Sequence, residues 1–199
     1  MNNLLLNKFE SGTDFNSFLK TSKNYIETID TSAFDDEEKH LFEYTKLNNT
    51  RMERCLKTYK IPENLLNILT EIKEEQNWLV ITENWCGDSA QILPGIYLMS
   101  EAAPKVKLSI IERDKNLDIM DQYLTNGSRS IPKLISIDNS GKELFNWGAR
   151  PQEAQNQVTQ WVTAKIDKEI WHQDLHLWYA RNRGVALFSE FEKILFVYA

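Results

Sequence analysis

Residues 78–94 read WLVITENWCGDSAQILP, and this stretch decides the fold class. Its first five residues, WLVIT, are apolar and rich in β-branched side chains, which is typical of a strand buried on both faces of a sheet. The residues from Gly87 onward are typical of a helix. Cys86 therefore stands where a buried strand passes into a helix, and it is the residue that we expect to carry chemistry.

Working outward, the pattern predicts an α/β protein with a mixed sheet flanked by helices. A second strand is expected over 106–112, and the runs LISID and ELFNW are expected to form a hairpin around the turn at 139–141. The crossovers predict parallel strands, and the hairpin predicts one antiparallel pair at the end. Helices are expected over 13–29, over 35–59 as one helix or as two that break near Asn48 and Asn49, from Pro62, over 87–101, 117–124 and 151–168, and over 169–199 with a break at Gly184.

The predicted position of Cys86 has a chemical consequence. Free backbone N–H groups and the helix dipole stabilise an anion at the start of a helix, so they lower the pKa of a thiol there. Asp88 is a competing negative charge that raises this pKa, and the sequence does not decide which effect is larger. Ser89, one turn further on, can hydrogen-bond the sulfur but cannot form a disulfide with it. The site therefore has a single thiol.

Composition excludes several classes of partner. A net charge of −6 argues against a surface that binds nucleic acid, which needs clustered Lys and Arg. No apolar run approaches the ~20 residues that span a bilayer, so no membrane association is expected. The start of the chain lacks the features of a secretory signal, which makes a cytoplasmic location the expectation. The two cysteines are 31 positions apart and are expected to be thiols.

The segment WCGDS resembles the WCGPC motif of thioredoxin, and further features agree with this over residues 62–168. Pro94 lies eight positions after the cysteine, where thioredoxins carry a helix proline, and RSIPKLISI is similar to their cis-proline loop. The pair Gly148 and Ala149 matches the glycine that closes the thioredoxin substrate groove. The resemblance implies a thioredoxin-like domain at 62–168, an N-terminal helical extension at 1–61 and a C-terminal helical extension at 169–199 packed on the domain.

The resemblance also implies roles for individual residues. Ile131 would pair its backbone with an extended substrate chain, and Pro132, as the cis-proline, would pack against the sulfur of Cys86. The residues implied in catalysis are Cys86 and Ser89, and those implied in substrate binding are Trp85, Gly87, Asp88, Ile131, Pro132 and Gly148.

Three departures from the family pattern decide the functional hypothesis. Ser89 replaces the resolving cysteine, Asp88 replaces the motif proline, and Val80 replaces a buried acid. Such a CxxS site is expected to form a mixed disulfide with a protein or a small thiol and to hold it until an external thiol such as glutathione releases it. The alternative is a non-catalytic protein-binding module, and a third interpretation is a subunit that dimerises through its terminal helices. Whether the protein is an enzyme stays open, and no cofactor or metal is expected.

Other chemistry-bearing residues have simpler interpretations. Cys55 lies on the apolar face of a predicted helix, so core packing is favoured over a role in resolving Cys86 through space. Glu169, His172 and His176 have a spacing that can bind zinc, but a packed or solvated helix face is favoured because no further ligand is identifiable. Arg129 lies beside the expected groove, where it binds an acidic substrate or satisfies loop carbonyl groups.

Overall fold

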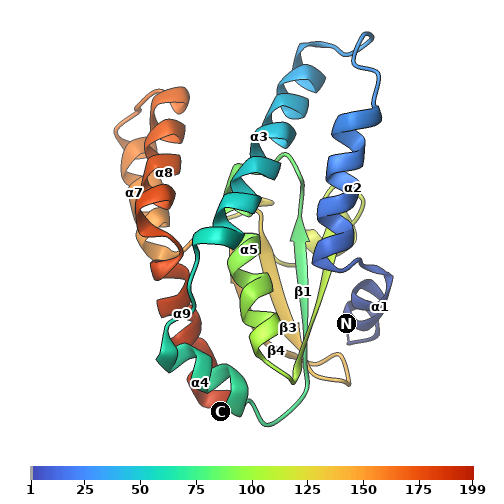
Figure 1. Cartoon of the computed structure of the whole chain (residues 1–199), viewed down its shortest axis with the longest axis vertical. Coiled ribbons are helices and arrows are strands. Elements are labelled where there is room, and N and C mark those ends of the chain that lie inside the picture. Colours follow the sequence, from blue (N-terminus) through green and yellow to red (C-terminus); the bar gives the residue numbers. More distant parts are fainter. Residues whose placement is uncertain (1) are drawn as a thin grey trace.

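The computed structural model describes residues 2–199 and has a four-stranded sheet at its centre (Figure 1). Along the sheet the strands stand in the order β2, β1, β3, β4. The strands are β1 (Gln76–Thr82), β2 (Val106–Glu112), β3 (Lys133–Ile137) and β4 (Glu143–Gly148). The helices are α1 (Asn2–Ser11), α2 (Phe15–Thr28), α3 (Asp36–Thr58), α4 (Glu63–Glu71), α5 (Gly87–Ala102), α6 (Leu117–Met120), α7 (Gln152–Thr163), α8 (Lys168–Asn182), α9 (Val185–Leu195) and the short 3₁₀ helix η1 (Phe196–Tyr198).

The predicted mixed sheet is confirmed, but one strand direction differs from the expectation. β1 and β2 are parallel, whereas β3 runs antiparallel to β1 and β4 antiparallel to β3. The helix between β2 and β3, α6, has only four residues and spans about 6 Å at 1.5 Å per residue. A strand of seven residues such as β2 spans about 23 Å. Residues 113–132, between β2 and β3, contain no helix that returns the chain along the sheet as α5 does between β1 and β2, and β3 begins at the end where β2 finishes.

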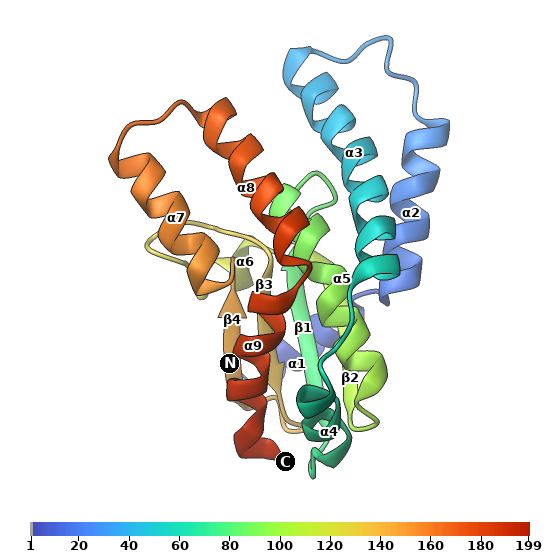
Figure 2. The same ribbon diagram turned by 60° about the vertical axis from the view of Figure 1, so that its left-hand side comes forward.

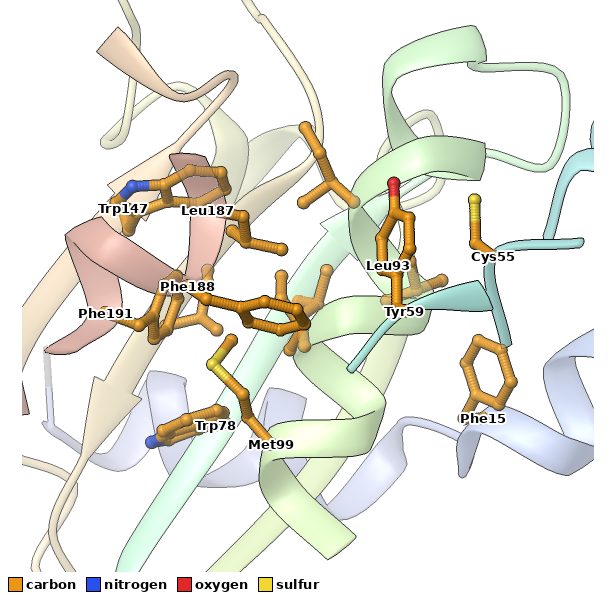
Figure 3. Close-up of a cluster of buried hydrophobic side chains, with 14 of the residues drawn as sticks. Phe15, Cys55, Tyr59, Trp78, Leu93, Met99, Trp147, Leu187, Phe188 and Phe191 are labelled. Carbon is orange, nitrogen blue, oxygen red and sulfur yellow. The ribbon is translucent and has the colours of Figure 1, made fainter. Parts of the chain in front are cut away.

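Successive side chains of β1 point to opposite faces of the sheet, so the core has one cluster on each face. Trp78 and Val80 face the larger cluster, whereas Leu79 and Ile81 face a second cluster that includes Leu5 of α1 and Ile119 of α6. On the larger side α9 packs closely on the sheet (Figure 3). The ring of Phe191 lies 5.6 Å from that of Trp78 and 5.4 Å from that of Trp147 between centroids, as is favourable for tilted aromatic pairs.

Of the two possibilities for residues 35–59, the structure has a single helix, α3, that is continuous through Asn48 and Asn49. Both amides are buried and hydrogen-bonded. The Nδ2 group of Asn49 donates to Ser22 Oγ at 2.8 Å, and that of Asn48 donates to the carbonyl oxygen of Asn84 at 3.0 Å. These tertiary bonds explain asparagine in the middle of a helix, although the Nδ2 group of Asn49 also donates to the carbonyl oxygen of Thr45 one turn back, at 2.9 Å.

The predicted helix over 151–168 is wrong at its C-terminal end. α7 stops at Thr163, Lys165 adopts a left-handed conformation with φ of 55°, and α8 begins at Lys168. A left-handed residue ends a helix because it reverses the direction of the chain. Asp167 then caps α8 by accepting a hydrogen bond from the backbone N–H of Glu169. The predicted break at Gly184 is confirmed, with φ of 83° between α8 and α9.

Two helix pairs extend beyond the sheet at the end where β1 passes into α5. Figure 2 shows α2 with α3 on one side, α7 with α8 on the other, and the start of α5 between α3 and α8. Across the described part of the chain, no helix combines the length and the apolar character that a membrane span requires.

Candidate functional site

Cys86 lies at the N-terminus of α5, as predicted, and occupies the N-cap position. Its sulfur accepts a hydrogen bond from the backbone N–H of Ser89 at 3.5 Å and donates its own proton to the carbonyl oxygen of Ile131 at 3.4 Å. Only 8% of the residue is exposed. Two of the residues that the sequence singled out, 45 positions apart, are thus in direct contact.

Two segments beside the cysteine, one before β3 and one at the end of β4, each have an unusual peptide bond. The Ile131–Pro132 bond is cis, the geometry that the resemblance implies, and the Gly148–Ala149 bond is also cis. Gly148 has φ of 128° and pairs with Lys133 across the hairpin. A Cβ atom at Gly148 would lie 2.3 Å from the carbonyl oxygen of Pro132, so only glycine fits this approach.

The two opposing effects expected on the Cys86 thiol are resolved in favour of the neutral form. Its pKa is raised to about 11, chiefly by burial and then by the negative charge of Asp88. The hydroxyl of Ser89 and the backbone N–H groups of Ser89 and Asp88 act in the opposite direction but are outweighed. A thiol with this pKa is ionised in about one molecule in ten thousand at pH 7.

Asp88 lies in a buried group of charged and hydrogen-bonding side chains, named here the Asp88 cluster and made of Asp88, Arg150 and Tyr179. The guanidinium of Arg150 lies 2.6 Å from Oδ2 of Asp88, and the hydroxyl of Tyr179 donates to Oδ1 at 2.8 Å. Burial, followed by the charge of Asp88, raises the pKa of Tyr179. Asp88 therefore links the start of α5 to Arg150, in the segment before α7, and to Tyr179 of α8.

His176, which like Tyr179 belongs to α8, packs against the WCGDS motif at Gly87. A Cβ atom on Gly87 would lie 2.8 Å from Cε1 of His176 and 3.7 Å from a guanidinium nitrogen of Arg51 on α3. Burial and then the charge of Arg51 lower the pKa of His176 to about 3, so the imidazole is neutral near pH 7. Its Nδ1 is buried without a hydrogen-bond partner among the described residues. The face that carries His176 is thus packed against the site.

The spacing of His172 and His176 brings no third metal-ligating side chain to them in the described structure. Within residues 2–199, no three His, Cys, Asp or Glu side chains gather as a group that could hold a metal ion. His172 lies instead against Trp171, with 4.2 Å between ring centroids in an edge-on arrangement.

Close packing of His176 on Gly87 leads to a first prediction. Gly87→Ala is expected to destabilise the protein by about 1 kcal/mol, because overpacking a filled site outweighs the better helix propensity of alanine. Adding His176→Ala makes room for the new methyl group, so the double variant should lose less stability than the sum of the two single changes. Urea unfolding of the four proteins measures this coupling, and strictly additive losses would contradict the contact.

The remaining motif residues are held by neighbours in the sheet and loops. The hydroxyl of Ser89 accepts a hydrogen bond from that of Thr82 at 2.6 Å, in the buried layer beneath the cysteine. The guanidinium of Arg113 lies over the ring of Trp85, 4.9 Å from its centroid, which is typical of a cation–π contact. Trp85 is thereby fixed beside Cys86.

The structure bears on the expectations for Cys55 and Arg129. Cys55 is confirmed as a core residue: it is fully buried, and its thiol donates to Oε1 of Gln91 at 3.4 Å. Both cysteines are free thiols in the described chain. The guanidinium of Arg129 forms a two-point pair with Asp121 at 2.6 and 2.9 Å and not hydrogen bonds to loop carbonyl groups; binding of an acidic substrate by Arg129 stays a prediction.

Sequence reasoning missed the two residues that hold Asp88. Arg150 lies two positions after the Gly148 that the resemblance marked, and its place directly after the predicted groove is a signal that was open to use. Tyr179 had no comparable signal, because its separation of 91 positions from Asp88 is bridged only by folding.

Comparisons with known proteins agree with this architecture. A family model described as thioredoxin matches residues 35–163. A Pseudomonas aeruginosa protein of unknown function has a similar solved structure, with 20% identity, 96% of each chain covered and a TM-score of 0.59. An HIV epitope scaffold is similar at 19% identity over 98% of each chain, with a TM-score of 0.60. At these identities the two likenesses show a common fold. Thioredoxin from Fasciola hepatica matches at 22% identity over 48% of this chain and 89% of its own, with a TM-score of 0.33. None of the curated proteins compared with the chain matches it.

Proposed function

Because the chain belongs to the thioredoxin family, we propose that it exchanges thiols and disulfides through the single thiol of Cys86. The observation that carries this proposal is the contact between the sulfur of Cys86 and the carbonyl oxygen of Ile131, directly before a cis-proline and at the start of α5. A substrate laid along Ile131 and Pro132 would bring its disulfide to this sulfur.

The proposed exchange has two steps. The thiolate of Cys86 attacks one sulfur of a disulfide R–S–S–R, a bond forms between Cys86 and that sulfur, and the other R–S⁻ leaves with the electron pair of the broken bond. An external thiolate then attacks the sulfur of the bound R group and releases Cys86 as a thiolate. Ser89 cannot complete the cycle internally because a hydroxyl does not form a disulfide. Glutathione and protein thiols are the chemical class that supplies the second step.

The raised pKa of Cys86 defines what must change before the sulfur reacts. The neutral form is favoured by burial and by Asp88, and α8 covers the adjacent Gly87 through His176. We place reaction in molecules in which α8 has moved away from the start of α5, so that solvent and the helix dipole stabilise the thiolate.

A second candidate function is a binding module in which Cys86 is inert. Its 8% exposure and its pKa of about 11 favour this alternative, because both suppress the thiolate. The two candidates differ in whether any disulfide forms at Cys86, and that difference is directly measurable.

We expect bis(2-hydroxyethyl) disulfide to add one hydroxyethylthio group to Cys86 and none to Cys55, which is fully buried. Intact mass and peptide mapping identify the modified residue. The rate should rise with pH toward the pKa of about 11, as the thiolate population grows. Excess glutathione should then remove the group.

The matched controls are Cys86→Ala, which should not react, and Cys55→Ala, which should react as the unaltered protein does. An adduct confined to Cys55, or none at Cys86 even at alkaline pH, would leave the binding module as the function.

A further inference from the structure

We propose that the pocket between the α2–α3 helix pair and Trp85 binds an aromatic side chain, flanked by a basic residue, of the polypeptide that reacts at Cys86. This inference rests on the proposed function for the identity of the reacting residue. The pocket has a volume of about 210 Å³, and its lining runs from Tyr25 and Phe34 across α3 to Asn84 and Trp85. It therefore opens beside the residue that directly precedes Cys86.

The volume fits one side chain. A cavity of about 150 Å³ in another protein holds benzene, while pockets for whole small molecules begin near about 300 Å³. The 210 Å³ available here lies between these values. A phenylalanine, tyrosine or tryptophan side chain that belongs to a longer polypeptide matches this space.

The lining is aromatic and is arranged around Phe42. The rings of Tyr25 and Phe34 each lie 6.0 Å from that of Phe42 between centroids, both edge-on. Aromatic rings prefer this arrangement and offset stacking, so a further ring entering between Phe34, Phe42 and Trp85 meets favourable contacts. An apolar group without a ring would fill the space less well.

The pocket is fixed to the candidate site by a hydrogen bond from α3, in which the amide of Asn48 donates to the carbonyl oxygen of Asn84 at 3.0 Å. The hydroxyl of Thr45, which donates to the carbonyl oxygen of Leu41 at 2.9 Å, also lies 3.4 Å from Oδ1 of Asn84. Adjacent Cα atoms are about 3.8 Å apart, and an extended chain advances about 3.3 Å per residue. Because the pocket is lined by the residue next to Cys86, a side chain near the reacting cysteine of a substrate can reach it, and we place the aromatic residue two or three positions away.

Negative charge at the mouth of the pocket favours a basic residue next to the bound aromatic residue of the polypeptide. Glu38 lines the mouth, and the same first turn of α3 carries Asp36 and Glu37, all three exposed. Lys39 lies 3.9 Å from Asp36 and offsets one of these charges. The surplus of negative charge attracts an arginine or lysine next to the bound ring and repels an acidic one.

The test separates binding from chemistry by using serine analogues. Eight-residue labelled peptides carry serine in place of the reacting cysteine, with Phe two or three positions before or after it and Arg beside the Phe. Fluorescence anisotropy gives their affinities. We expect the best Phe peptide to bind about ten times more tightly than its Ala counterpart, which is the discrimination that one buried apolar group provides. Replacing Arg by Glu in the peptide should weaken binding further.

Variants of the pocket make the result specific. Phe34→Ala and Ile29→Ala each remove part of the lining and should abolish the preference for Phe over Ala. Glu38→Gln keeps the capping hydrogen bond to the backbone N–H of Asp35 but removes the charge, so it should abolish only the preference for Arg. Phe196→Ala is the matched control, because Phe196 is 72% exposed and lies outside the pocket.

The outcomes distinguish this inference from the proposed function. Equal affinity for the Phe and Ala peptides overturns the pocket, as does a preference that survives in both lining variants, whatever bis(2-hydroxyethyl) disulfide does at Cys86. A preference that the lining variants remove supports the pocket, even if Cys86 forms no disulfide and the proposed exchange fails.

Discussion

In the Asp88→Asn protein, iodoacetamide at pH 7 is expected to alkylate Cys86 about ten times faster than in the unaltered protein. A neighbouring carboxylate typically raises the pKa of a thiol by about 1 or more. Removing the carboxylate lowers this pKa again, and a decrease of about 1 multiplies the thiolate population at pH 7 about tenfold. Asp88 is the largest cause after burial of the raised pKa of Cys86. The substitution also leaves the positive charge of Arg150 in place, which stabilises the thiolate. The pH at which alkylation reaches half its maximum should therefore fall below about 11.

The same substitution should cost about 3 kcal/mol of stability, since it removes one partner of a largely buried ion pair. The side chains of Arg150 and Asp88 are 18% and 10% exposed, so solvent screens the pair only weakly. Urea unfolding measures this loss. Asparagine keeps an oxygen that can accept the hydrogen bond from Tyr179.

Two controls separate the effect of removing the charge of Asp88 from the effect of a less stable structure. Cys55 reports global opening within the same molecule, because it is fully buried and reacts only if the core opens. Tyr179→Phe removes the hydrogen bond between α8 and Asp88 but keeps the charge. If Tyr179→Phe accelerates alkylation of Cys86 as much as Asp88→Asn does, loss of the hydrogen bond to α8, and not loss of the negative charge, explains the faster reaction of Asp88→Asn.

Much of the central fold was predictable because its signals are local. The apolar, β-branched run WLVIT predicts β1, and the change of pattern at Gly87 places Cys86 at the start of α5. The turn at 139–141 likewise predicts the hairpin of β3 and β4. In each case a few consecutive residues carry the physical cause, so tertiary contacts had little to override.

Features set by distant contacts or by single backbone angles were not predictable. The direction of β3 depends on whether the segment between β2 and β3 crosses back along the sheet, and the apolar pattern that predicts a helix over 117–124 does not show that α6 ends at Met120. The end of α7 depends on the left-handed conformation of Lys165, and nothing in the sequence around Lys165 predicts that conformation. Positions 88 and 179 interact across most of the fold, so the pKa of Cys86 could not be given a direction before the Asp88 cluster was known.

The largest effect on stability is expected for Gly148→Ala, at about 3 kcal/mol or more. Alanine is strained at a φ of 128°, and its Cβ would lie 2.3 Å from the carbonyl oxygen of Pro132 and 3.2 Å from Cα of Lys133. Both obstacles are backbone atoms, so no side-chain rotation relieves the clash. Urea unfolding measures the cost.

The matched control for this change is Gly127→Ala. Gly127 also has a positive φ, 77°, but no atom lies within 4 Å of the position that its Cβ would take. This variant should lose only about 1 kcal/mol, the usual cost of a left-handed alanine. The difference between the two variants isolates the contact between Gly148 and Pro132. Because the carbonyl of the preceding Ile131 accepts the proton of Cys86, the Gly148 variant should also alter the pH profile of alkylation, whereas the Gly127 variant should not. Equal losses of stability would mean that the loop yields at Pro132, and that Gly148 does not set the position of the groove beside the cysteine.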